Sequence, residues 1–113
     1  MASSQAPTLG EFEQLVLLAI IHQDEDAYGV TIRREIERRT RRTVAVGALY
    51  TALDRLEAKG LVTSAMSLPT RERGGRSKRF FTVTTAGEKA LLRSRDTMTR
   101  MWSGLQPDLS RSR

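Results

Sequence analysis

Residues 46–60 read VGALYTALDRLEAKG, and this stretch decides the fold. Apolar residues recur in it with the three- and four-residue spacing of a helix packed on a core: Leu49, Ala52, Leu53 and Leu56. Gly60 follows where a helix end favours a residue that tolerates the left-handed conformation. Gly47 and Ala48 make the first turn of the opposite face small. The stretch therefore predicts a helix with one buried face and one slim outer face.

The residues beside that outer face suit contact with a nucleic acid. Tyr50 and Arg55 offer a phenol and a guanidinium that can bind phosphate. Ala48 and Thr51 offer a methyl and a hydroxyl to base edges, as a helix in the DNA major groove requires. Asp54 would repel phosphate, so we expect it to pair within the molecule.

Two further helices are predicted before this stretch. Thr8 and Glu11 have the spacing of a capping box, and the apolar residues after them predict a helix that ends near His22. A second helix is predicted from about residue 27 to 40, with Tyr28, Ile32 and Ile36 facing the core. Residues 43–46 are β-branched enough to form one brief strand.

Two strands are predicted after Gly60, over residues 61–66 and 80–83. The connection between them contains Pro69, Gly74 and Gly75, and it is too long and too basic for a simple turn. Three helices followed by a hairpin with a long charged tip are typical of a winged helix-turn-helix domain. The predicted fold class is thus α+β.

A last helix is predicted after a cap at Thr84 or Thr85, and Leu91, Met98 and Leu105 recur in it every seven residues. It carries more apolar surface than the small domain needs, which favours a two-fold homodimer; the alternative is that it folds back on the helix of Phe12. The predicted organisation is a disordered N-terminal tail over 1–7, a winged helix-turn-helix DNA-binding domain over 8–85, a dimerisation helix over 86–106 and a polar tail over 107–113.

The net charge of +6 is concentrated in two basic blocks. Six arginines lie within residues 33–42, and they either bind a polyanion or solvate a helix through pairs such as Arg33–Glu37 and Glu35–Arg39. The second block surrounds the Gly74–Gly75 pair and indicates phosphate binding by the wing; its members are Arg71, Arg73, Arg76, Lys78 and Arg79.

Several classes of protein are excluded by composition. The chain has no cysteine and a single histidine, His22, so no disulfide, thiolate site or histidine-based metal site is expected. No catalytic triad, nucleotide-binding glycine loop or enclosed carboxylate pair is recognisable, so we predict neither an enzyme nor a bound cofactor. The longest apolar run is too short to span a membrane and no leader precedes it, which predicts a cytoplasmic protein.

The chain resembles the PadR-like family of bacterial transcriptional regulators, in its short form with one C-terminal helix. Five stretches in order carry the resemblance across about residues 9–92. They are Gly10-Glu11-Phe12-Glu13 with the apolar run after it; Ala27-Tyr28-Gly29; Gly47-Ala48-Leu49-Tyr50 with Leu53-Asp54-Arg55-Leu56-Glu57 and Lys59-Gly60-Leu61; Arg73-Gly74-Gly75-Arg76 with Lys78-Arg79-Phe80-Phe81; and Thr84 with Ala86-Gly87.

The resemblance implies a homodimeric winged-helix repressor whose third helices enter major grooves, with Tyr50 and the wing arginines on the DNA backbone. It implies a dimer interface built on the last helix and the first helix of the partner, here Phe12, Leu91, Met98, Met101, Trp102 and Leu105. Some short members bind flat aromatic molecules near a tryptophan of the last helix, so Trp102 is a candidate ligand contact and a small organic effector a candidate partner. One departure is that Ala45 and Val46 stand where a polar capping residue is common.

These residues are consistent with two functional hypotheses. The first is a sequence-specific regulator of transcription that binds double-stranded DNA through Gly47, Ala48, Tyr50, Thr51, Arg55 and the wing. The second is a winged-helix module that binds acidic proteins, with non-specific nucleic-acid binding between the two. The small first turn and Tyr50 favour the first, because a protein-binding module does not need them.

Overall fold

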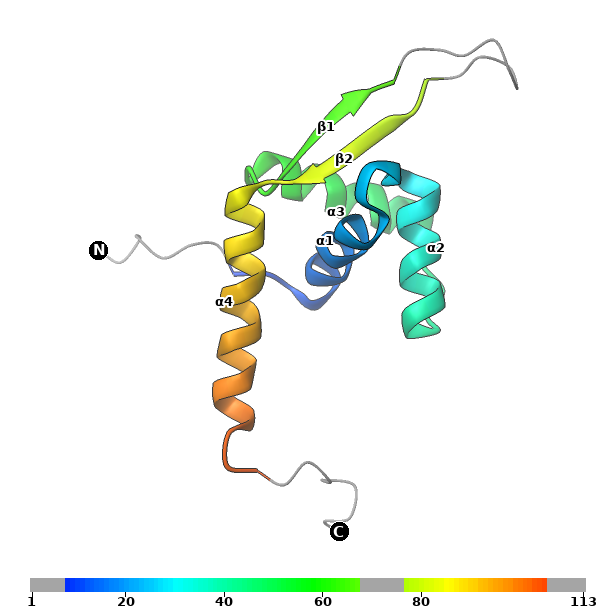
Figure 1. The fold of residues 1–113 in the computed structure, drawn as a ribbon. Coiled ribbons are helices and arrows are strands. Elements are labelled where there is room, and N and C mark those ends of the chain that lie inside the picture. The colour runs from blue at the N-terminus through cyan, green and yellow to red at the C-terminus, as the bar shows by residue number, and fades with distance from the viewer. Residues whose placement is uncertain (1–7, 68–76, 106–113) are drawn as a thin grey trace.

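The computed structural model describes residues 8–67 and 77–105 as four helices, a 3-10 turn and a two-stranded sheet. The elements in chain order are α1 (Glu11–Gln23), η2 (Asp24–Asp26), α2 (Gly29–Thr40), α3 (Val46–Ala58), β1 (Val62–Met66), β2 (Arg79–Val83) and α4 (Thr85–Trp102). In Figure 1, α1 lies at the centre of the domain, with α2 on one side and α4 on the other. The predicted α+β winged helix-turn-helix fold is confirmed.

The core lies where α1, α2 and α3 meet the base of the hairpin. All four apolar residues predicted to face inwards from α3 are buried, and so are Ile32 and Ile36 of α2. Val62 and Phe81 close the core from the strands. Burying one such aliphatic or aromatic side chain contributes about 1.5–3 kcal/mol, so the leucine face fixes the orientation of α3.

The helix boundaries correct some details of the prediction. Helix α1 starts at Glu11 after Gly10, and the Glu13 carboxylate accepts the Gly10 N–H at 3.0 Å, so the expected Thr8–Glu11 capping box is wrong. Tyr28 precedes α2 instead of lying on its core face, and Thr31 Oγ1 accepts its N–H at 3.0 Å. Ala45 gives α3 no side-chain cap, as its apolar character predicted. Gly60 has φ +76°, in the left-handed region expected for it.

The strand predicted over residues 43–46 does not form. Val44 is buried, and its N–H donates to Glu37 Oε2 at 2.8 Å instead of to a strand. Glu37 is thereby occupied, and the expected Arg33–Glu37 pair is not among the ion pairs of the described residues. A β-branched run needs a partner strand, and the described sheet contains β1 and β2 alone.

The hairpin is antiparallel, with Val62 opposite Val83 and Met66 opposite Arg79. It is joined to the segment before α2, because the Phe81 N–H donates to Ala27 O at 2.8 Å. The rings of Tyr28 and Phe80 pack edge to face, with centroids 5.4 Å apart. The tip of the wing, residues 68–76, lies outside the described residues, as do both predicted tails.

Helix α4 leaves the domain as a long rod (Figure 1). Thr84 is its cap, since Thr84 Oγ1 accepts the Gly87 N–H at 3.0 Å. Only Gly87 and Ala90 of α4 are buried. The helix ends at Trp102, a few residues before the predicted end at 106, and Gly104 follows with φ +84°.

Candidate nucleic-acid interface

The outer face of α3 is exposed and slim. Gly47, Ala48, Thr51 and Arg55 are all exposed, as the helical pattern predicted. A Cβ added at Gly47 would meet no atom within 4 Å, so the surface at this turn is bare backbone. A helix of this kind can approach a base pair closely, because no bulky side chain intervenes.

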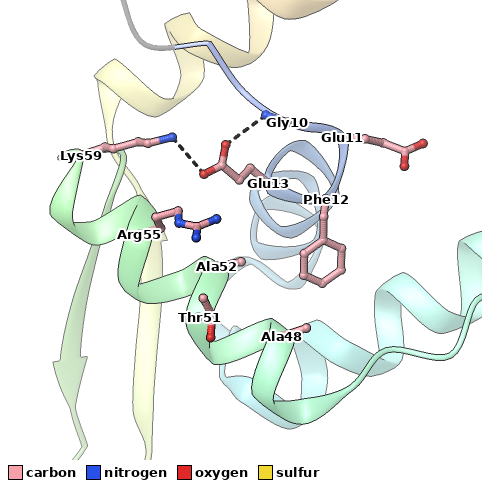
Figure 2. A pocket seen from close by; sticks show the side chains of 9 residues that line it. All are labelled: Gly10, Glu11, Phe12, Glu13, Ala48, Thr51, Ala52, Arg55 and Lys59. Atoms are coloured by element: carbon pink, nitrogen blue, oxygen red, sulfur yellow. Dashed lines mark hydrogen bonds and ion pairs between the residues drawn. The ribbon is translucent and has the colours of Figure 1, made fainter.

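A cleft of about 610 Å3, here called the α1–α3 cleft, runs beside that face (Figure 2). Its lining combines apolar, hydroxyl, acidic and cationic groups from Gly10, Glu11, Phe12, Glu13, Ala48, Thr51, Ala52, Arg55 and Lys59. Figure 2 shows the Phe12 ring pointing from α1 towards the turns of α3 that carry Ala48 and Ala52. Three of the predicted DNA-binding residues thus share one hollow with the start of α1.

The carboxylates of the α1–α3 cleft are both held by cations. Glu13 accepts Lys59 Nζ at 2.9 Å as well as the Gly10 N–H. Burial alone would raise the pKa of Glu13, but Lys59, the Gly10 amide and the charge of Arg55 together bring it below the usual value. Glu11 accepts both terminal nitrogens of Arg42 at 3.0 Å, which lowers the pKa of Glu11.

Arg55 is the cation that this arrangement leaves available. It takes part in none of the ion pairs of the described residues, although it lies between Lys59 and Ala52 at the wall of the cleft (Figure 2). An exposed guanidinium beside a slim helix face is suited to a phosphate oxygen, which it can bind with two parallel N–H groups.

The base of the wing is tied to α3 through Arg79. Its guanidinium pairs with Glu57, lies 3.7 Å from Asp54 Oδ1 and donates to Ser64 Oγ at 3.1 Å. The expected internal partner of Asp54 is thereby found. Arg79 is predicted to contact DNA, and in the folded chain its guanidinium has two carboxylate partners.

Lys78 directly precedes β2 and is exposed. Its Nζ is 4.3 Å from the centroid of the Tyr28 ring, a cation–π contact with the segment before α2. The remaining wing cations, Arg71, Arg73 and Arg76, lie outside the described residues.

The arginines of residues 33–42 divide into two groups. Arg38 and Arg39 both pair with Glu35, which is only 7% exposed, and Arg42 pairs with Glu11. The hydrogen bond from Arg39 lowers the pKa of Glu35 more than burial raises it, and Arg38 lowers it further. Half of this block is therefore occupied by ion pairs, within α2 for Arg38 and Arg39 and with α1 for Arg42. The electrostatic attraction for a polyanion rests on the other half.

A second, apolar hollow of about 590 Å3 lies between α1 and α4, and we call it the α1–α4 groove. Its large apolar members are mostly exposed: Leu18, Ile21, Leu91, Leu92, Met98 and Trp102. Sequence reasoning missed Leu18, Ile21 and Leu92. Phe12, predicted to lie at a dimer interface, lines the α1–α3 cleft. Gln14, two residues further along α1, lines the groove instead, because two residues of a helix rotate the side-chain direction by about 200°.

Within the described residues, no helix is both long and apolar enough to cross a bilayer.

Comparison with known proteins gives consistent matches. The model of the transcriptional regulator PadR-like family matches residues 17–93. Transcriptional regulator Rv3488 of Mycobacterium tuberculosis is 35% identical over 94 residues, which cover 80% of this chain and 83% of the relative. The structure of H. salinarum RosR grown from NaBr is similar at 25% identity and a TM-score of 0.66, covering 96% of this chain and 90% of that one. A PadR family transcriptional regulator from Eggerthella lenta shares the fold at 20% identity and a TM-score of 0.68, covering 90% and 83%.

Proposed function

Because this chain belongs to the transcriptional regulator PadR-like family, we propose that it is a homodimeric repressor that binds a specific sequence of double-stranded DNA. The family is one of transcriptional regulators, so the chain is a regulator and not an enzyme. The repressor blocks transcription by occupying a promoter in the cytoplasm. The observation that carries the proposal is the exposed Gly47–Ala48 turn of α3, beside a cleft in which Arg55 has no ion-pair partner among the described residues.

In the proposed complex α3 enters the major groove with Gly47 and Ala48 leading. Ala48 and Thr51 meet base edges, and Thr51 adds a hydroxyl that can donate or accept a hydrogen bond. Both side chains are exposed on the same wall of the α1–α3 cleft, which supports this assignment.

The backbone contacts come from two sides of α3. Tyr50 and Arg55 bind phosphates beside the helix, and Arg71, Arg73, Arg76 and Lys78 do so from the wing. We assign Arg79 a different role from the one its sequence suggested: it anchors the wing to α3, since Glu57 and Asp54 already balance its charge. These contacts carry no sequence information, but they set the register of the helix on the duplex.

The homodimer is built on residues 86–106, which include most of α4, and residues 8–85 form the DNA-binding domain. Met98, Met101, Trp102 and Leu105 are all at least half exposed in the single chain, and Leu91 continues the same helix towards the core. A second copy related by a two-fold axis would cover this surface and present two α3 helices to one side of a duplex. Phe12 is left out of this interface because it faces α3.

An aromatic effector is a second proposal for the α1–α4 groove. The volume of the groove, about 590 Å3, falls within the range of about 300–1,000 Å3 typical of small-molecule sites, and the Trp102 indole could stack on a flat aromatic molecule. Binding there would act at the place where the second copy docks.

The test begins with selection of an operator from a random duplex library by the wild-type protein. Affinity for the selected duplex is then measured by fluorescence anisotropy with excess competitor DNA. We expect Tyr50→Ala and Arg76→Ala to weaken binding to every duplex by about tenfold or more, and Thr51→Val to change the preferred sequence. Selection of no sequence would favour non-specific binding, and absence of DNA binding would favour the protein-interaction module.

A further inference from the structure

Gly29 is buried although it is the first residue of α2, and the residue that covers it is Tyr50 of α3. A Cβ built at Gly29 would overlap the Tyr50 hydroxyl oxygen and lie 2.8 Å from Cζ of the ring. Carbon atoms in good contact stay about 3.5–4.0 Å apart, so no other residue fits here with the phenol in its present place. The phenol therefore lies directly on bare backbone.

Tyr50 cannot make room by moving its helix. Its neighbours Leu49 and Leu53 are fully buried in the core, which fixes the axis and the rotation of α3. A methyl group at position 29 would consequently turn the Tyr50 side chain about its own torsions, away from α2.

The support beneath Gly29 is itself rigid. Ala27 is fully buried and accepts the Phe81 N–H, and Tyr28 packs against Phe80. The segment 27–29 thus touches the wing through two residues and α3 through the third. A phenol held against this segment keeps one orientation, which reduces the conformational entropy lost when its hydroxyl binds a ligand.

We propose that Gly29 is a positioning residue: its missing side chain holds the Tyr50 hydroxyl where a DNA phosphate meets it. The inference rests on the proposed function, because it takes a phosphate as the ligand of Tyr50. It explains why glycine stands at a helical first turn with no positive φ to require it.

The contact is tested first without DNA, by a double-mutant cycle on thermal stability with Gly29→Ala and Tyr50→Ala. We expect Gly29→Ala to lower the melting temperature of the wild type but not that of the Tyr50→Ala variant, where alanine should favour the helix. The chain has two tyrosines, so 3-fluorotyrosine labelling gives two 19F resonances that Tyr50→Phe assigns. Gly29→Ala should shift the Tyr50 resonance most.

The role in binding is tested by a second cycle on the selected operator. Gly29→Ala and Tyr50→Phe should each weaken binding by about tenfold, and the double variant should also lose about tenfold instead of a hundredfold. Val30→Ala changes the neighbouring exposed residue without adding an atom over Tyr50, so it should bind like the wild type.

Additive losses in either cycle, or an unshifted Tyr50 resonance, would overturn the inference. So would an unchanged affinity for Tyr50→Phe, and in that case a wild type that still selects an operator leaves the proposed function standing. A wild type that selects no operator removes the proposed function, and the phosphate role of Gly29 with it.

Discussion

At the scale of single residues, glycine serves opposite purposes in two kinds of environment in this domain. Gly47 faces open space on α3, whereas Gly29 and Gly87 lie against other parts of the chain. Open space means that folding does not require the glycine, so its value must lie in what the surface later contacts. Close packing means that folding itself requires the gap.

Gly47→Ala should therefore stabilise the protein and weaken DNA binding at once. Alanine is up to about 1 kcal/mol more favourable than glycine within a helix, and its Cβ meets nothing in the free protein. On the operator the same methyl would hold α3 away from the duplex, and we expect about a tenfold loss of affinity. Urea denaturation and fluorescence anisotropy measure the two effects, and an unchanged affinity would show that α3 does not approach DNA through this turn.

At the scale of elements, one of the contacts that attach α4 to the domain leaves no room for a side chain. A Cβ at Gly87 would overlap the carbonyl oxygen of Leu61 and lie 2.7 Å from Val83 Cγ1. The first of these is backbone, which cannot rotate away as a side chain can.

Gly87→Ala should accordingly destabilise the protein by about 1–3 kcal/mol, the usual cost of overpacking. The chemical change is the same as in Gly47→Ala, which serves as the matched control with the opposite sign. Urea denaturation of both variants gives the comparison. Equal stability of Gly87→Ala and the wild type would mean that α4 is not attached through this contact.

Sequence periodicity predicts the elements well, because each helix packs one face and the pattern is local. The buried face of α3 follows from four residues within two turns. The strand expected over 43–46 fails for a non-local reason, since only the rest of the fold decides whether a partner strand is present. The predicted start of α1 is wrong for a related reason. Thr8 and Glu11 have the same three-residue spacing as Gly10 and Glu13, and it is the second pair that forms the cap.

The candidate site was predicted less completely than the elements. Exposure of Ala48, Thr51 and Arg55 follows from the helical wheel, but partners distant in sequence do not. Lys59 reaches Glu13 across 46 residues, and Arg79 reaches Glu57 across 22. From the sequence, Lys59 and Arg79 could be predicted only as basic residues. The folded chain shows that both already pair with carboxylates.

At the scale of the whole molecule, three paired carboxylates make the protein sensitive to acid. Glu11 and Glu13 pair with cations from other parts of the chain, and Glu35 pairs with arginines one turn further along α2. The pKa values of Glu11, Glu13 and Glu35 are all lowered in the folded state, so the unfolded chain takes up protons first as the pH falls. The stability they contribute is fully present above the ordinary carboxyl pKa of about 4.5 and is lost below it, as the pH passes through the folded values.

We therefore expect the melting temperature to fall as the pH drops below about 4.5, and to depend little on these groups near neutral pH. Glu35→Gln should be less stable than the wild type at pH 7, because glutamine cannot pair with Arg38 and Arg39. Its melting temperature should also decline less over the acid range. Melting temperatures are measured by circular dichroism. If those of the two proteins fell in parallel with pH, Glu35 would not contribute to the acid sensitivity.

The assembly of the molecule is the remaining question at this scale, and two exposed methionines allow it to be tested. Met98 is 54% exposed on α4 and lines the α1–α4 groove, whereas Met66 is 63% exposed on β1 at the wing. If two copies meet along α4, burying a charge at Met98 is costly and a charge at Met66 is not. Met98→Glu should be a folded monomer at concentrations where the wild type and Met66→Glu are dimers, as sedimentation equilibrium would measure.

Loss of the dimer should also change how the protein binds DNA. Two α3 helices held together bind half-sites about 34–36 Å apart, and the second contact forms within the complex. Met98→Glu should therefore lose at least about a hundredfold in affinity for a selected two-fold symmetric operator, while its affinity for a single half-site stays that of the wild type. A Met98→Glu variant that remains dimeric, or a wild type that sediments as a monomer, would mean that α4 does not join two copies and that a single α3 must account for binding.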